Sequence, residues 1–149
     1  MAARFSSFQQ PRNSADPQKL RAKEMKKVFT VAIAEKNRSI RDFLLRELSS
    51  SGHNVIAAEN GAQICAEIEG EHPPDLLIMD LEIPDADSAK IFEKAQRRTP
   101  PLPVIVHTFL TEESERDNLD KENIYLEKSR NIDYLKAAIA NMLKRLYPD

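Results

Sequence analysis

Several apolar stretches of this chain are followed directly by a polar residue, and the side chains of these residues are of the types that phosphoryl transfer uses. The four residues are Glu35, Asp80, Thr108 and Lys128. At Asp80 an apolar run ends abruptly, with Glu82 and Pro84 close behind. A carboxylate can attack a phosphoryl group and hold it as an acyl phosphate. Since the transferring group is strongly anionic, such a site needs a divalent cation held by acids, an ammonium group and a hydroxyl donor in one place.

These side chains can meet only if the apolar stretches are neighbouring parallel strands. β-Branched and apolar runs predict strands at 28–34, 53–58, 75–81, 104–108 and 124–127. Helical spacing predicts helices over 38–51, around Ile64 to Ile68, over 88–98, from Thr111 onward and from Ile132 to Leu146. The run 75–81 has no polar alternation, which is typical of a strand covered on both faces. The alternation predicts a doubly wound α/β/α domain with right-handed crossovers.

Charge is unevenly spread along the 149 residues. Residues 1–27 hold seven Lys/Arg and two Asp/Glu, a net of +5, and the remainder holds fifteen and twenty-two, a net of −7. We therefore expect a disordered basic tail over 1–26 and an acidic domain over 27–149, which is a poor candidate for binding duplex DNA. The single cysteine predicts a reducing, cytoplasmic location, and no apolar run approaches the roughly 20 residues that span a membrane.

The order and spacing of six short segments resemble the bacterial response-regulator receiver domain from about Val28 to Leu146. The segments are Ile40–Leu44, Gly52–Val55, Asn60–Gly61, Pro74–Leu81, Pro103–Val106 and Tyr125–Lys128. Each is common alone, but together in this order they are quite specific. The resemblance implies a five-stranded parallel sheet in the flavodoxin-like order 2-1-3-4-5, with helices on both faces.

The resemblance also implies roles for the site residues. Asp80 would accept phosphate from a sensor histidine kinase, Thr108 would follow the phosphoryl group, and Lys128 would supply the ammonium group. Tyr125 falls at the aromatic switch position. Each has a simpler interpretation as well: Asp80 as a strand end, Lys128 as a solvated lysine and Tyr125 as core packing. His107 has no metal-ligand neighbour at useful spacing, so we interpret it as structural.

The implied function is a signalling switch in a phosphorelay, not an enzyme with turnover. On phosphorylation the face of the fourth helix, fifth strand and fifth helix would rearrange. Because no output or DNA-binding domain follows the last helix, we expect a stand-alone regulator whose output is a protein contact. This face, with Lys136, Lys144 and Arg145 on the last helix, is the expected surface for a downstream protein or a homodimer.

The chain departs from the family at the expected Mg²⁺ site. The resemblance implies that Glu35, Asp80 and the backbone carbonyl of Glu82 hold the ion, but Lys36 replaces a second acid after the first strand. An ammonium group cannot ligate Mg²⁺, and unit charges ~4 Å apart repel by ~4 kcal/mol at an effective dielectric of 20, doubled for a divalent ion. Lys36 is expected either to pair with Asp80 or Glu35 and take the electrostatic role of the metal, or to extend into solvent.

Four further departures lie near the site: Ser88, Phe109, Asn123 and Ser129. Phe109 stands where a small residue usually leaves room for the phosphoryl group, and Ser129 where proline is usual. Together with Lys36 they indicate a divergent receiver. Two functions therefore stay open, a phosphoacceptor switch at Asp80 and a pseudo-receiver that binds proteins independently of phosphorylation. A flavodoxin-like cofactor protein is excluded, because no phosphate-binding loop follows the first strand.

Overall fold

The computed structural model describes residues 28–109, 123–128 and 131–148. The strands are β1 (Thr30–Ala34), β2 (Asn54–Ala58), β3 (Leu76–Met79), β4 (Val104–Thr108) and β5 (Asn123–Glu127). The helices are α2 (Arg38–Ser50), α3 (Gly61–Glu69), α4 (Ser88–Arg97) and α6 (Ile132–Leu146). All strand pairs are parallel and the sheet order is β2-β1-β3-β4-β5, which confirms the expected topology.

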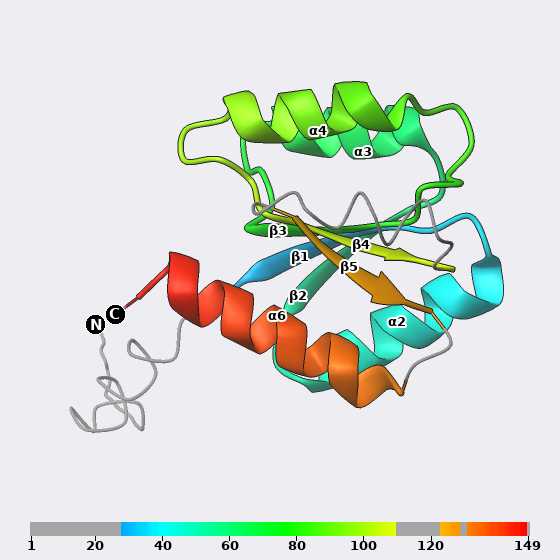
Figure 1. Ribbon diagram of the computed structural model, residues 1–149, viewed down its shortest axis with the longest axis vertical. Coiled ribbons are helices and arrows are strands. Elements are labelled where there is room, and N and C mark those ends of the chain that lie inside the picture. The colour runs from blue at the N-terminus through cyan, green and yellow to red at the C-terminus, as the bar shows by residue number, and fades with distance from the viewer. Residues whose placement is uncertain (1–27, 110–122, 129–130, 149) are drawn as a thin grey trace, which may run out of the picture.

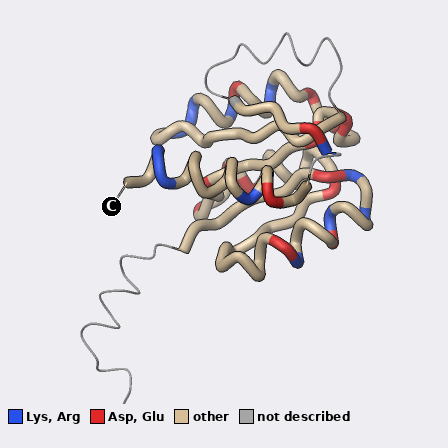
Figure 2. Tube along the Cα trace, turned by 60° about the horizontal axis from the view of Figure 1, so that its bottom comes forward, with Lys and Arg blue, Asp and Glu red and all other residues tan. Residues whose placement is uncertain are grey.

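Helices cover the sheet on both sides, as Figure 1 shows, with α3 and α4 on one face and α2 and α6 on the other. Alternate residues of each central strand enter two separate cores. On β1, Ala32 packs on the α3/α4 side, whereas Val31 and Ile33 pack on the α2/α6 side. This double burial explains why the central runs show no polar alternation. In Figure 2 the strand interiors are free of charge, and charged residues lie on helices, in loops and at strand ends.

Asparagine and aspartate caps start the helices directly after short connections. The capping residues are Asn37, Asn60, Asp87 and Asn131. Asn37 lies only three residues past the end of β1, and its side chain accepts a hydrogen bond from the Ile40 N–H at 3.0 Å. Such a cap satisfies an N–H that the helix leaves unpaired. It therefore fixes the backbone between β1 and α2, where Glu35 and Lys36 lie.

The loop after β3 is held against the start of α3. The Gly61 N–H donates to the Pro84 carbonyl at 2.9 Å. A Cβ atom at Gly61 would lie 2.3 Å from the Asp85 carbonyl oxygen and 2.5 Å from the Ala86 Cβ, so only glycine allows this approach. Asp85 itself has a φ of 54°. The loop that carries Glu82 is thus locked to the neighbouring helix.

Most predicted elements agree with the structure, and the differences lie at their ends. The first strand begins at Thr30 and not at 28, because Val28 is 61% exposed and precedes the paired residues. The strand expected over 75–81 is shorter, Leu76–Met79, so that Asp80 is the first residue beyond it. The tail at 1–26, the helix from Thr111 and Ser129 fall outside the described residues. None of the described helices has the length and apolar character to cross a membrane.

Lys136 on α6 forms an ion pair within the fold, and its place on a partner-binding surface stays a prediction. Its ammonium group lies 3.0 Å from Glu47 Oε1 on α2, and both side chains are about one-third exposed, 31% and 29%. The pair links the two helices of one face. Charge reversal at Lys136 would therefore also break this pair, whereas Lys144 and Arg145 lie exposed in the last turn of α6.

Candidate functional site

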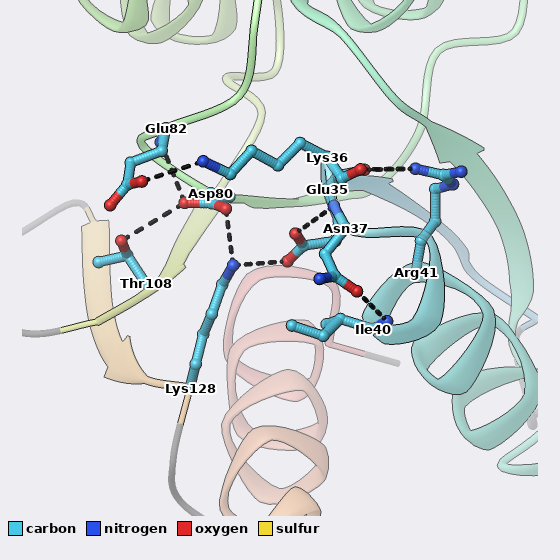
Figure 3. Close-up of polar contacts among 9 residues, drawn as sticks. All are labelled: Glu35, Lys36, Asn37, Ile40, Arg41, Asp80, Glu82, Thr108 and Lys128. Atoms are coloured by element: carbon cyan, nitrogen blue, oxygen red, sulfur yellow. Dashed lines mark hydrogen bonds and ion pairs between the residues drawn. The ribbon is translucent and has the colours of Figure 1, made fainter.

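Four neighbouring strands bring the predicted site residues together at one edge of the sheet. Glu35, Asp80 and Lys128 each follow the last residue of β1, β3 or β5, and Thr108 is the last residue of β4. Because these strands are parallel, their carboxyl ends share one edge. Figure 3 shows the Lys128 side chain reaching up between the two carboxylates.

Asp80 is buried, and both of its carboxylate oxygens have partners. Oδ2 lies 2.6 Å from Lys128 Nζ. Oδ1 accepts from the Glu82 backbone N–H at 3.0 Å and from the Thr108 hydroxyl at 3.4 Å. Only 4% of the Asp80 side chain is exposed. The Asp80 carboxylate therefore lies beside an ammonium group and a hydroxyl donor, which is the setting that an attacking carboxylate needs in phosphoryl transfer.

Glu35 shares the Lys128 ammonium group with Asp80. Its Oε1 lies 2.8 Å from Lys128 Nζ, and its Oε2 accepts from the Asn37 backbone N–H at 2.9 Å. Burial lowers the pKa of Lys128, but hydrogen bonds and the charges of Asp80 and Glu35 outweigh that effect, and its pKa is raised. Lys128 is therefore a permanent cation between two buried acids, and the interpretation as a solvated lysine is wrong.

Of the two expectations for Lys36, contact with Asp80 or Glu35 is wrong, and extension toward solvent is closer to its position. Its ammonium group lies 3.1 Å from Glu82 Oε1, across the mouth of the site from the end of β1 (Figure 3). Both side chains are largely exposed, 48% for Lys36 and 63% for Glu82. The physical reason is that Lys128 already occupies the space between the two buried acids, so Lys36 pairs with the nearest acid at the surface.

Sequence reasoning assigned no role to Arg41, although the residue lies within a segment used for the family resemblance. Its guanidinium donates to the Glu35 carbonyl at 2.9 Å and to the Lys36 carbonyl at 3.3 Å. It also lies 3.6 Å from Glu59, and its side chain is only 15% exposed. Arg41 thus braces the backbone that carries both Glu35 and Lys36. An arginine in the first turn of a helix gave no signal that distinguished it from a solvated one.

His107 on β4 and Phe109, the first residue after β4, flank the site. The Lys128 ammonium group lies 5.5 Å from the centroid of the Phe109 ring, which is a cation–π distance, and Phe109 is 59% exposed. His107 is buried, and its Nδ1 has no hydrogen-bond partner among the described residues. Burial and the Lys128 charge lower the pKa of His107 to about 4, against the opposing effect of Asp80. His107 is therefore neutral, and a neutral core residue agrees with its structural interpretation.

Tyr125 lies on β5 next to β4, opposite Val106 in the register. It is partly buried and packs against the core on the α3/α4 side. This position agrees with core packing. A switching role would require a second arrangement of the ring and stays a prediction.

The arrangement of these acids does not fit a magnesium ion. Mg²⁺ requires oxygen ligands in near-octahedral geometry. Within 28–109, 123–128 and 131–148, no three His, Cys, Asp or Glu side chains are placed to hold a metal ion. Lys128 bridges Glu35 and Asp80, and Lys36 neutralises Glu82. We therefore assign no chemical step to a metal.

A doubly wound parallel sheet with an acid, a hydroxyl and an ammonium group at its carboxyl edge defines the receiver class of signalling domain. Comparison with known proteins agrees. Residues 31–140 match the family described as response regulator receiver domain. Because this match covers well over half of the chain, the chain belongs to the response-regulator receiver family of two-component signalling, whose members interact with histidine kinases.

Individual relatives share the domain but differ in length. The chain is 30% identical over 121 residues to the response regulator MprA of Mycobacterium leprae, covering 80% of this chain and 53% of that protein. It is 35% identical over 81 residues to the virulence transcriptional regulatory protein PhoP of Salmonella typhimurium, covering 54% of this chain and 36% of that protein. The chain thus spans about half the length, or less, of these curated relatives.

Solved structures support the fold alone. A response regulator receiver protein from Sinorhizobium medicae superposes with a TM-score of 0.71 at 18% identity, over 79% of this chain and 96% of that one. A CheY-like receiver domain from Methanospirillum hungatei gives a TM-score of 0.70 at 24% identity, over 80% and 96%.

Proposed function

We propose that Asp80 accepts a phosphoryl group from a sensor histidine kinase and thereby switches a protein-binding face. The observation that carries this proposal is the set of contacts on Asp80. Its carboxylate lies 2.6 Å from the Lys128 ammonium group and 3.4 Å from the Thr108 hydroxyl. Phosphoryl transfer depends on positioning and on charge stabilisation, and these two groups supply both beside a buried nucleophile.

In the proposed step, an Asp80 oxygen attacks the phosphorus of a phosphohistidine. The new O–P bond forms as the P–N bond breaks, and the imidazole of the kinase leaves with the electron pair and takes up a proton. Lys128 stays beside the carboxylate and neutralises charge on the phosphoryl oxygens. The Thr108 hydroxyl exchanges its bond to Asp80 for one to a phosphoryl oxygen. The product is an acyl phosphate, so Asp80 is a phosphoacceptor and the domain has no turnover.

Movement of Thr108 would transmit the effect of phosphorylation from Asp80 to the surface of the domain. Thr108 and Glu127 are opposite each other in the β4–β5 register, and Tyr125 lies two residues earlier on β5. A shift at the end of β4 would therefore reach β5 and the adjoining α6 first. We propose that this face, in the cytoplasm, contacts a downstream protein or a second copy of the domain.

The test is intact-protein and peptide mass spectrometry after incubation with acetyl phosphate, with and without Mg²⁺. We expect one phosphoryl adduct on the wild type, located on Asp80 and absent from Asp80→Asn. The matched control is Asp87→Asn, because Asp87 only caps α4 and asparagine caps helices equally well. An adduct that survives Asp80→Asn would overturn the assignment.

A second candidate function is a pseudo-receiver that binds proteins without phosphorylation. The Lys36–Glu82 ion pair across the site mouth favours it, since this pair takes the place of a metal-binding arrangement. In that case the wild type gains no adduct under any condition, and Asp80→Asn binds partner proteins as the wild type does.

A further inference from the structure

The two lysines at the site lie in different surroundings. Lys128 is inside, with a side chain 5% exposed, and Lys36 is at the mouth, with a side chain 48% exposed. We propose that this site excludes divalent cations and that Lys36, held by Glu82, is its built-in second cation. The inference concerns cation binding, and it does not depend on whether Asp80 accepts phosphate.

The carboxylate oxygens that could ligate an ion are already engaged by protein donors. Both carboxylate oxygens of Glu35 are engaged, one by the Lys128 ammonium group and one by a backbone N–H. Both carboxylate oxygens of Asp80 are engaged as well, one by Lys128 and the other by a backbone N–H and the Thr108 hydroxyl. Glu82 Oε1 is engaged by Lys36. A hard cation would have to displace two ammonium groups to gain three carboxylates, and Mg²⁺ also gives up its own water reluctantly.

The charge at the site is nearly balanced without a metal. Three carboxylates, Glu35, Asp80 and Glu82, face two ammonium groups, Lys36 and Lys128, which leaves a net charge of −1. A divalent ion would reverse that sign. With aspartate at position 36 the same cluster would carry −3, which a divalent ion would reduce to −1. The residue at position 36 alone therefore decides whether a divalent ion neutralises this cluster or overcharges it.

The backbone holds Lys36 at this place. Its carbonyl accepts from Arg41 at 3.3 Å, and the neighbouring Asn37 caps α2. On the opposite side, the Glu82 N–H donates to Asp80, so Glu82 is anchored to the buried acid. The backbone at both residues is thus held in place, and the ion pair with Glu82 at 3.1 Å places the Lys36 ammonium group at the site mouth.

The experiment measures cation binding directly, using Mn²⁺ as the probe. Free Mn²⁺ is followed by electron paramagnetic resonance, and Mg²⁺ by isothermal titration calorimetry. The variants are Lys36→Asp, Lys36→Ala and Lys94→Asp. Lys94 is the matched control because it forms an exposed pair of similar geometry with Glu69, 3.0 Å apart and 38% and 59% exposed, away from the site. Circular dichroism establishes that each variant is folded.

We expect no saturable Mn²⁺ or Mg²⁺ binding to the wild type or to Lys94→Asp over the concentrations tested. Lys36→Asp should bind saturably, with a dissociation constant at least about tenfold below the highest of those concentrations. Lys36→Ala should fall between, because it removes repulsion without adding a ligand. Binding by the wild type as tight as that of Lys36→Asp would overturn the inference. Absence of binding in folded Lys36→Asp would also overturn it, because Lys36 would then not be the cause. Failure of acetyl phosphate labelling would instead count against the proposed phosphoacceptor role and leave these results unaffected.

Discussion

Replacing Lys128 with methionine should destabilise the domain more than any other single change at the site. Methionine keeps the length of the side chain but removes the charge between Glu35 and Asp80, which lie 2.8 and 2.6 Å from Lys128 Nζ. All three side chains are 5% exposed or less, so solvent cannot replace the lost cation. Removal of one partner of such a buried pair costs about 3–5 kcal/mol of folding free energy.

The assay is urea unfolding followed by circular dichroism at neutral pH. Adding Asp80→Asn to Lys128→Met should restore stability, because it removes one of the two unpaired charges. Lys94→Met, which breaks an exposed pair, should cost much less than Lys128→Met. If Lys128→Met costs no more than Lys94→Met, the description of a buried charge triad is wrong.

Three further changes test neighbouring features. The folded pKa of His107 is about 4 against 6.5 in the unfolded chain, so protonation favours the unfolded state. The free energy of unfolding should therefore fall by about 3 kcal/mol at most as the pH drops from 6.5 to 4. In urea unfolding, His107→Gln should lose less stability over this pH range than the wild type. Gly61→Ala should lower stability by about 1–3 kcal/mol in the same assay, since its Cβ would meet the Asp85 carbonyl oxygen at 2.3 Å, and an unchanged midpoint would contradict the close approach. Phe109→Ala should shorten the lifetime of a phosphoryl adduct on Asp80, measured by mass spectrometry over time, because it uncovers the Lys128 side of the site to water.

The sequence pattern predicted the alternating parallel strands and helices, and the family resemblance supplied the strand order and the residues that meet at the sheet edge. The carboxyl ends of neighbouring parallel strands lie at the same edge of the sheet, so polar residues at those ends lie close together. For this reason Asp80, Thr108 and Lys128 were correctly predicted to meet. The partner of Lys36 was not predictable in this way. It depends on where the loop after β3 presents Glu82, and that loop is placed by its contact with Gly61 on α3. Such a contact between segments distant in the chain cannot be predicted from residue types and their order alone.

The two lysines of the site affect different properties: Lys128 affects the stability of the fold, and Lys36 affects the binding of divalent ions. Lys128 is buried between two acids, so its loss should change the free energy of unfolding. Lys36 forms an exposed pair with Glu82, and exposed pairs contribute only about 0–1 kcal/mol, so its loss should leave stability nearly unchanged. What Lys36 changes is the net charge of the cluster that a divalent ion meets, which is −1 with lysine and would be −3 with aspartate. A substitution at position 36 can therefore alter the cation requirement of this receiver without requiring any compensating change in its core.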